Sequence, residues 1–211
     1  TIEFFEEVAK FRVARKVYAK ILKEKFPDIV TVSDDNAAIV EQCSVIFLGL
    51  LPGVAREILP PLNFNGKTVI SMMAAINYEE TLSLVPTASP SHVTRTVPLP
   101  SAARRVGPIL LYPIPSVDLT HSSVTVLNQV GNVIACKTEA EMLPLISITG
   151  HISSFYELMN VTQQWAVSKD VHEQSAQLFI ASFYSSLSNF ALDNVQQQHS
   201  SGAPQQEPFA G

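Results

Sequence analysis

The hydrophobic pattern is organised around a short run at residues 44–52, Ser-Val-Ile-Phe-Leu-Gly-Leu-Leu-Pro. Its apolar part, Val45–Leu48, does not alternate with polar residues, which is typical of a strand buried on both faces of a parallel sheet. Helical patterns flank it at Asn36–Gln42 and residues 54–59, and a second apolar run follows at residues 68–73. The pattern predicts a right-handed strand–helix–strand unit, and hence an α/β fold with a parallel sheet.

Ligands of open α/β sheets bind just beyond the carboxyl ends of the strands. The loops at those ends are residues 49–53 and 74–78. The sequence therefore predicts a ligand site over these two loops. A second interpretation stays open, in which Gly49 and Pro52 are only turn residues that end the first strand.

Further elements are predicted on both sides of this unit. Apolar residues at helical spacing indicate one or two helices over residues 3–25. Asp35 and its neighbours Ser33 and Asp34 are candidate N-caps for the helix at Asn36–Gln42, and Asn77 is one for a helix at residues 77–85. The other predictions are strands at residues 29–32, 92–97, 107–112 and 132–136, and a helix at 124–130. The later strands are expected to extend the sheet as a small mixed sheet.

The pattern becomes helical from Glu139 to about Leu192. Residues 142–165 are apolar nearly all round, and a helix of that kind must be buried on all sides. In so small a domain, a second chain is the expected source of that cover. From Gln196 onward the chain is rich in Gln, Ser, Pro and Gly, which predicts disorder. We expect a sheet domain at 1–137, an all-α domain at 138–195 and a disordered tail at 196–211.

Composition excludes several classes of protein. Hydrophobic residues make up 46% of the 211 residues, yet no apolar run reaches the roughly 18–20 residues of a membrane span. The net charge is −5, and the Lys and Arg residues at positions 10–25 lie on a helical pattern that also holds Glu, as on a solvated helix face. Nucleic-acid binding is therefore not expected. A charged stretch followed by an apolar one does not open the sequence, so no signal peptide is expected.

The two cysteines and five histidines do not indicate a metal site. Cys43 and Cys136 lack metal-ligand spacing, and each has apolar neighbours. We expect both to be buried free thiols in a reducing, cytoplasmic compartment. The histidines are scattered, and structural or surface roles are expected for them.

Common catalytic and cofactor motifs are missing. The sequence has no Gly-x-Ser-x-Gly, no His-Glu-x-x-His and no Gly-rich loop followed by Lys-Ser/Thr. It also has no Gly-x-Gly-x-x-Gly, the turn that holds a dinucleotide after the first strand of such a sheet. The pair Arg104-Arg105 is interpreted as a solvated turn rather than an anion site.

Four ordered segments resemble the pyrroline-5-carboxylate reductases, in particular a divergent, bacterial-type branch, over about residues 12–187. Residues 32–36 (Val-Ser-Asp-Asp-Asn) resemble the segment whose Asn meets the adenosine end of the cofactor. Residues 45–52 resemble a strand and loop that in the family ends Ala-Val-Lys-Pro, beside the ribose and nicotinamide. Residues 69–76 (Val-Ile-Ser-Met-Met-Ala-Ala-Ile) resemble the next strand and turn. Residues 95–100 (Arg-Thr-Val-Pro-Leu-Pro) stand where the family has Arg-x-Met-Pro-Asn-Thr-Pro.

The resemblance implies a reductase that uses NADP or NAD to transfer a hydride to a small cyclic imine or carbonyl substrate, as in proline biosynthesis. It also implies a Rossmann-like dinucleotide-binding domain at 1–137, and a homodimer formed through an all-α dimerisation domain at 138–195. The residues that it assigns to the cofactor are Arg12, Asn36, Gly49, Leu50, Leu51, Pro52 and Ala75. Those that it assigns to the substrate are Pro98, Leu99, Pro100, Ser101 and Ser182, with Ser182 as the catalytic candidate.

The sequence also departs from the family at positions that matter for chemistry. Leu99 replaces the family's Asn, and Leu51 stands where a Lys is usual. Residues 181–185 (Ala-Ser-Phe-Tyr-Ser) replace Gln-Thr-x-x-Gly, whose Thr meets the substrate, although Ser182 retains a hydroxyl. Two alternatives therefore stay open. One is a dimeric dinucleotide-binding or interaction protein that has lost catalysis, and the other is a structural dimer without a cofactor.

The amino-terminal part of the family pattern is also incomplete. The family begins with a strand, a glycine turn, a helix and a second strand, and the first strand and its glycines are absent here. Arg12 resembles a residue that follows the second strand and can hold the 2′-phosphate of NADP. We therefore expect that residues before Thr1 and near Phe11 are missing from the sequence given.

Overall fold

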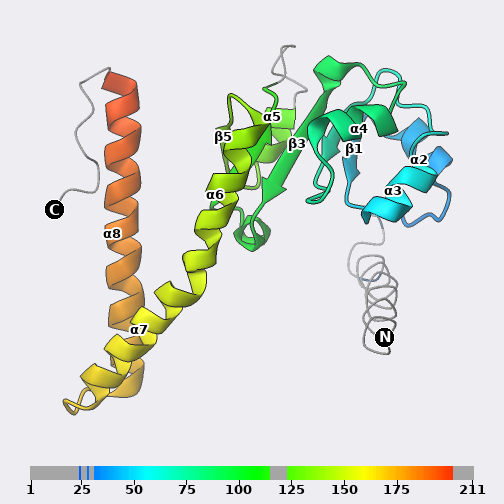
Figure 1. The fold of residues 1–211 in the computed structure, drawn as a ribbon. Helices are drawn as coiled ribbons and strands as arrows, with labels where there is room; N and C mark the ends of the chain where they lie inside the picture. The colour runs from blue at the N-terminus through cyan, green and yellow to red at the C-terminus, as the bar shows by residue number, and fades with distance from the viewer. Residues whose placement is uncertain (1–23, 25–27, 29–30, 115–122, 202–211) are drawn as a thin grey trace. The chain divides into compact units, whose positions relative to one another are not determined.

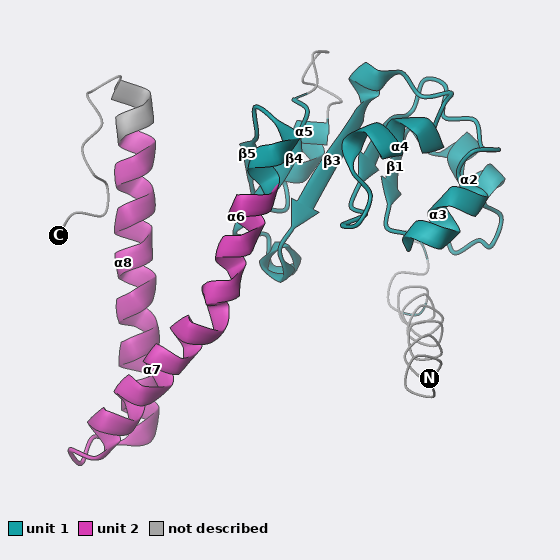
Figure 2. Ribbon diagram, viewed as in Figure 1, with its two compact units in different colours: residues 1–142 teal, residues 143–211 magenta. Residues whose placement is uncertain are grey.

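The computed structural model describes residue 24, residue 28, residues 31–114 and residues 123–201. The chain forms two compact units, Thr1–Met142 and Leu143–Gly211, shown in teal and magenta in Figure 2. The first unit contains the sheet, and the second is helical. The boundary falls slightly later than the expected one after residue 137, because Glu139 and Met142 still contact Arg95 of the sheet.

Five strands form one mostly parallel sheet in the order β1-β2-β3-β4-β5 (Figure 1). β1, β2 and β3 run parallel, β4 is antiparallel to β3, and β5 is parallel to β4. This confirms the predicted α/β class and the mixed extension after the third strand. The strands are β1 (Val45–Leu48), β2 (Thr68–Ser71), β3 (Val93–Pro98), β4 (Pro108–Tyr112) and β5 (Asn132–Ala135).

The helices of the first unit follow the predicted sequence signals closely. Asp35 caps α2 by accepting hydrogen bonds from the amides of Ala37 and Ala38, both at 3.0 Å. Asn77 caps α4 by accepting one from the Glu80 amide at 2.8 Å. The α-helices are α2 (Asn36–Gln42), α3 (Pro52–Ile58), α4 (Tyr78–Leu84) and α5 (Ser123–Asn128). Short 3-10 helices lie at η1 (Pro90–His92), η2 (Pro100–Arg104) and η3 (Glu139–Glu141).

Hydrophobic clusters lie on both faces of the sheet. Neighbouring residues of β2 belong to different clusters, Val69 to one and Ile70 to the other, because successive side chains of a strand point to opposite faces. The first cluster includes the fully buried Phe64 and Ile76, and the second includes Leu111. β2 is therefore buried on both faces, as its unbroken apolar run predicts.

The prediction that the first run is also buried on both faces is wrong for one residue. Ile46 and Leu48 are buried, but the side chain of Phe47, which points to the other face, is 45% exposed. α5 contacts β2 and β5 on that side, whereas β1 is the outermost strand of the described sheet. The apolar run thus predicted the strand correctly, but it did not predict that the second face of the strand is partly exposed.

Other predictions differ from the structure at the ends of elements and at a cysteine. Thr31 and Val32 are not in a strand, whereas residues 29–30 and most of the helix predicted over 3–25 lie outside the described residues. Cys43 is exposed because it follows the last turn of α2, so only Cys136 is a buried thiol as predicted. Burial, with a smaller contribution from nearby Glu141, raises the pKa of the Cys136 thiol.

The described part of the second unit is made of helices. They are α6 (Met142–Ile148), the 3-10 turn η4 (Thr149–His151), α7 (Ile152–Val167) and α8 (Glu173–Ser201). α7 and α8 pack against each other and are joined by a tight turn at Asp170, whose φ is 63°. α8 continues to Ser201, so the disorder predicted from Gln196 is wrong for residues 196–201, and residues 202–211 lie outside the description.

Across the described ranges, no helix combines the length and the apolar character needed to cross a membrane.

A close approach of η2 to the start of β4 depends on one glycine. Gly107 has a φ of 92°, in the region that favours glycine, and a Cβ there would lie 2.3 Å from Oγ and 3.2 Å from Cβ of Ser101. Its carbonyl accepts a hydrogen bond from the Asn132 amide at 2.9 Å, which joins β4 to β5. Gly107 thus fixes the path of the chain between β3 and β5.

Replacing Gly107 by alanine is expected to lower the free energy of unfolding by about 1–3 kcal/mol, because the new Cβ meets both backbone strain and Ser101. Urea unfolding of Gly107→Ala measures this loss. Gly53→Ala is the matched control, since no atom lies within 4 Å of its added Cβ. Gly53 is inside α3, where alanine favours the helix by up to about 1 kcal/mol. Equal unfolding midpoints for the two variants would contradict this account.

Candidate functional site

Three turns meet at one edge of the sheet, because β1, β2 and β3 are adjacent and parallel. In the register of the sheet, Leu48 pairs with Ser71, and Ser71 pairs with Arg95. The chain leaves these strands in the same direction, so residues 49–52, 74–77 and 98–101 follow the carboxyl ends (Figure 1). We call these three segments the carboxyl-edge turns. The loops predicted from the sequence to form a site are thus brought to one edge.

The first carboxyl-edge turn leads from β1 into α3. Gly49 is exposed, and a Cβ there would lie at an ordinary 3.8 Å from Cε of Met72. Gly49 is therefore not required by the backbone. Leu50 packs on the first core cluster, whereas Leu51 is 53% exposed and precedes Pro52, the first residue of α3. This turn presents backbone atoms and apolar side chains. Leu51 stands where the pyrroline-5-carboxylate reductases usually have Lys.

The second carboxyl-edge turn has the smallest side chains. Ala74 and Ala75 are exposed, whereas Ile76 is fully buried and anchors the turn in the core. The Ile76 amide donates to the carbonyl of Met73 at 3.2 Å. The turn therefore exposes two small side chains at the carboxyl ends of the strands.

The third carboxyl-edge turn is stiff and mostly apolar. Pro98 ends β3, Leu99 precedes η2 in an extended conformation, and Pro100 is the first residue of η2. Pro98, Leu99 and Ser101 are half-buried, and Pro100 is exposed. The proposed substrate residue Ser101 packs against Gly107, as the short distance to an added Cβ there indicates.

A charged cluster behind the second turn was not predicted as functional. Arg95 on β3 donates to the carbonyl of Ala74 at 3.0 Å and to Glu139 at 2.9 Å, and Glu139 also accepts from the Tyr78 amide at 2.8 Å. An Arg in an otherwise apolar strand pattern was the available signal. Its partner lies 44 residues further along the chain, so sequence spacing could not identify the pair.

Tyr78 anchors the start of α4 as a neutral side chain. Its hydroxyl donates to the carbonyl of Pro90 at 3.1 Å, and its ring meets Tyr112 edge-on at 5.5 Å. Burial raises the pKa of Tyr78, with smaller contributions from Glu79 and Tyr112. The phenol therefore stays protonated through the neutral pH range and serves to hold the turn.

Three predicted site residues are not part of the carboxyl-edge turns. Asn36 is exposed at the first position of α2, and Arg12 lies outside the described residues. Ser182 is exposed on α8, in the second unit. The other predicted site residues, at positions 49–52, 75 and 98–101, all belong to these turns.

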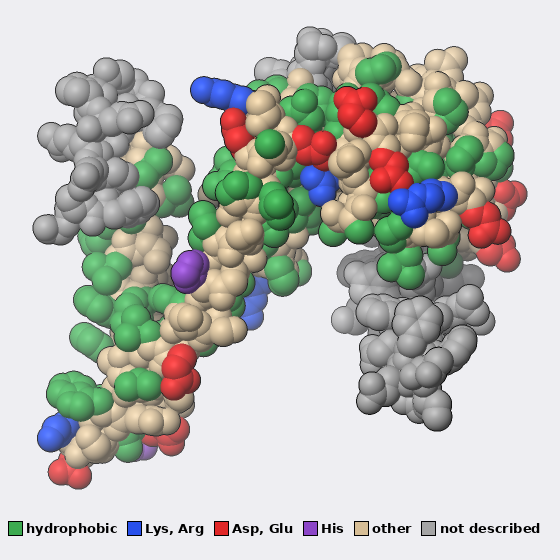
Figure 3. Space-filling model, viewed as in Figure 1, with side chains coloured by type: hydrophobic (Ala, Val, Ile, Leu, Met, Phe, Trp, Pro, Cys, Tyr) green, Lys and Arg blue, Asp and Glu red, His purple; other side chains and the backbone are tan. Residues whose placement is uncertain are grey.

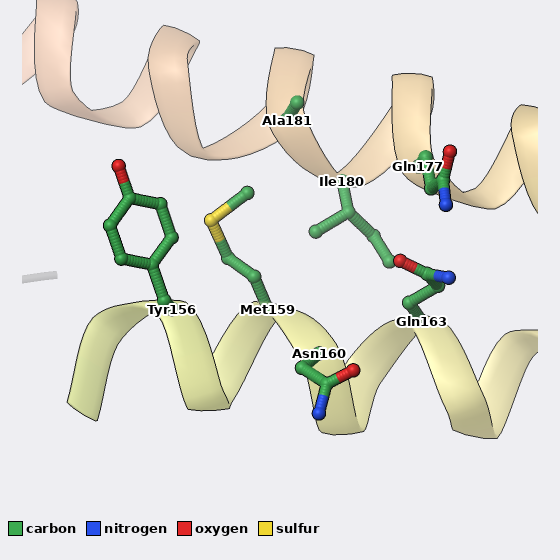
Figure 4. Close-up of a pocket in the computed structure, with 7 residues that line it drawn as sticks. All are labelled: Tyr156, Met159, Asn160, Gln163, Gln177, Ile180 and Ala181. Atoms are coloured by element: carbon green, nitrogen blue, oxygen red, sulfur yellow. The ribbon is translucent and has the colours of Figure 1, made fainter. Parts of the chain in front are cut away.

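A groove lies between α7 and α8 (Figure 4). It has a volume of about 320 Å³ and combines apolar with amide side chains: Tyr156, Met159, Asn160, Gln163, Gln177, Ile180 and Ala181. Two of the amides are held by one carboxylate, because Glu173 accepts from Gln163 at 3.2 Å and from Gln177 at 3.3 Å. The lining carries no charged side chain, so it favours packing over acid–base chemistry.

In the described part of the chain, no group of three or more His, Cys, Asp or Glu side chains could hold a metal ion.

Comparison with known proteins gives matches at the level of structure. No protein-family profile and no curated protein sequence matches the chain. A pyrroline-5-carboxylate reductase from Coxiella burnetii aligns over 88% of this chain and 71% of its own, with a TM-score of 0.69 and 19% identity. The Streptococcus pyogenes enzyme aligns over 81% and 65%, with a TM-score of 0.60 and 18% identity.

Two more distant groups of structures share the arrangement. The Plasmodium falciparum pyrroline carboxylate reductase, solved with NADP bound, aligns over 84% of this chain and 70% of its own at 14% identity, with a TM-score of 0.60. A reductive aminase from Aspergillus terreus, solved with NADPH, aligns over 90% and 69% at 15% identity, with a TM-score of 0.52. The chain therefore has the fold of the pyrroline-5-carboxylate reductases, which imine reductases share.

Proposed function

We propose that this chain is an NAD(P)H-dependent reductase that acts on a C=N or C=O bond of a small substrate. The observation that carries the proposal is the set of three open turns at the carboxyl edge, in a fold shared with reductases solved with NADP or NADPH. Ligands of such sheets bind at this edge. NADP is the preferred cofactor, and a small cyclic imine is the preferred substrate, as in the pyrroline-5-carboxylate reductases.

The exposed turns fit the nicotinamide end of a dinucleotide. Gly49 and Ala75 present small, exposed positions, and Leu50, Leu51 and Pro52 supply an apolar wall beside them. These residues would hold the nicotinamide and its ribose. Asn36 and Arg12 would bind the adenosine end.

Substrate would be held by the third carboxyl-edge turn, where Pro98, Leu99, Pro100 and Ser101 would shape an apolar pocket. Ser182 is the hydroxyl that the resemblance to the pyrroline-5-carboxylate reductases assigns to the substrate. The bound cofactor supplies the hydride. The protein contributes orientation and exclusion of water, and a proton must reach the substrate nitrogen or oxygen from Ser182 or solvent.

A second candidate function is cofactor binding without catalysis. Leu99 and Leu51 are apolar at positions where the pyrroline-5-carboxylate reductases carry Asn and Lys, and Leu51 is largely exposed. Loss of two polar groups from the same edge favours a protein that binds the dinucleotide but does not use it. Tight NADPH binding without oxidation of NADPH by any cyclic imine or carbonyl compound would support this candidate over the reductase.

The sheet edge is tested by placing a carboxylate in the second turn. Ala75→Glu is expected to weaken NADPH binding at least tenfold, a loss of about 1.4 kcal/mol, because the new side chain is larger at this exposed position and repels the cofactor's phosphates. Titration followed by nicotinamide fluorescence measures the affinity. In wild-type protein, ligand at about a hundred times Kd should add about 2.7 kcal/mol of stability.

Asn65→Glu is the matched control. Asn65 is also exposed, but it precedes Thr68, the first residue of β2, so it lies near the amino ends of the parallel strands. The affinity of this variant for NADPH should equal that of the wild type. The proposed function fails if wild-type protein binds neither NADPH nor NADH, or if Ala75→Glu and Asn65→Glu lose affinity equally.

We further propose that two copies of the chain associate through the second unit. Among the described residues of this unit, only Ala176 and Ile180 are buried, so it has almost no core of its own. Figure 3 shows hydrophobic side chains along its helices, and they include Phe155, Trp165, Leu178, Phe179, Phe183 and Phe190. Monomeric proteins rarely expose this much contiguous apolar surface. A second copy offers the same apolar faces, and stable dimers bury about 1,200–2,000 Å².

The dimer is tested at Phe179, which is 72% exposed and stacks on Phe183 with ring centroids 6.3 Å apart. Phe179→Glu is expected to weaken self-association by at least about thirtyfold, because burying an unpaired carboxylate costs 2 kcal/mol or more. Sedimentation velocity measures the mass, which is 23.1 kDa for one chain. Gln129→Glu adds the same charge at an exposed position of the sheet unit and should leave the dimer intact. A wild-type chain that sediments as a monomer would contradict the proposal.

A further inference from the structure

We propose that Arg95 and Glu139 are positioning residues that hold the second carboxyl-edge turn and thereby set the cofactor contact made by Ala74 and Ala75. We call these two residues the turn clamp. The cofactor part of this inference rests on the proposed function. The structural part, which is the control of the turn by Arg95, does not.

The turn clamp joins three segments that are far apart in the sequence. Nη2 of Arg95 donates to the carbonyl of Ala74 at 3.0 Å, and Nη1 donates to Oε1 of Glu139 at 2.9 Å. The same oxygen of Glu139 accepts from the amide of Tyr78 at 2.8 Å. The turn is thus gripped at both ends, at Ala74 by the guanidinium and at Tyr78 by the carboxylate.

The charges of the turn clamp are largely removed from water. The side chains of Arg95 and Glu139 are 12% and 24% exposed, and Nη1 of Arg95 also lies 3.7 Å from Sδ of the buried Met142. Nε of Arg95 is buried without a hydrogen-bond partner among the described residues. Loss of one partner would leave the other as an uncompensated, mostly buried charge. A pair of this kind holds its geometry more firmly than an exposed one.

The turn has few other restraints between the two points that the clamp holds. Ala74 and Ala75 have small, exposed side chains that contribute little packing. Ile76 is fixed in the core, and Asn77 caps α4. The path of the backbone at Ala74 therefore depends on the bond from Arg95. Because positioning errors of about 1 Å at a reacting centre can cost on the order of a hundredfold in rate, this restraint matters for hydride transfer.

The test compares Arg95→Met, Arg95→Lys and Glu139→Gln with Arg56→Met. Arg56 forms the other described ion pair of this unit, 2.6 Å from Glu80, with side chains 56% and 30% exposed, so its loss removes an ion pair at the surface. Arg95→Met removes the hydrogen bonds that the guanidinium of Arg95 donates to Ala74 and Glu139. Arg95→Lys keeps the charge but cannot reproduce the forked geometry, and Glu139→Gln keeps an acceptor for the Tyr78 amide.

Two measurements separate positioning from general stability. The first is amide hydrogen exchange of residues 74–78 in the protein without ligand, relative to the strands. The second is affinity for NADPH and for an adenosine bisphosphate that represents the adenosine half of the cofactor. Arg95→Met should speed amide exchange of the turn by at least about tenfold. It should weaken the affinity for NADPH by about tenfold, and it should change the affinity for the adenosine bisphosphate by less than about twofold. Arg95→Lys and Glu139→Gln should have smaller effects in the same direction, and Arg56→Met none.

The outcomes are distinct. Unchanged exchange of the turn in Arg95→Met, or equal weakening of NADPH and the adenosine half, would overturn the inference. If Arg95→Met does not fold, the same two measurements on Glu139→Gln and Arg95→Lys decide whether the turn clamp positions the turn. If wild-type protein binds no dinucleotide, the proposed function fails, and hydrogen exchange alone decides whether the turn clamp holds the turn.

Discussion

The parallel pairing of β1, β2 and β3 is the constraint on which the site depends. Parallel neighbours end at the same edge, so three turns from distant parts of the sequence become adjacent without any contact between their own side chains. The apolar runs in β1 and β2 supply the burial that makes this pairing stable. The mixed extension through β4 and β5 then relies on Gly107, where only a residue without a side chain fits.

The second unit, unlike the sheet unit, buries few apolar side chains in its described part. Its helices have apolar residues on nearly every side, and the described part of the unit buries almost none of them. A hydrophobic unit without its own core needs cover, and self-association supplies matching surfaces in a symmetric way. The same helices carry Ser182, the hydroxyl that we assign to the substrate. Assembly and substrate binding are therefore proposed to share one part of the chain.

Local signals in the sequence predicted the elements well, and long-range features were missed. Asp35 and the helix at Asn36–Gln42 were predicted with their observed bounds, because capping is a local interaction. The exposure of Phe47 depends on which helices cover a face, and the pairing of Arg95 with Glu139 joins residues 44 apart in the sequence. Residues 196–201 were expected to be disordered from their composition, yet Gln is a good helix former and extends α8.

The central claim is that a nicotinamide dinucleotide binds across the carboxyl-edge turns. The most direct measurement is the change in backbone amide chemical shifts when NADPH is added to isotope-labelled protein. The account predicts that the largest changes fall at residues 49–52 and 74–77, with further changes near residues 98–101. Changes confined to the opposite edge of the sheet or to the α7–α8 groove, or no changes at saturating NADPH, would contradict it.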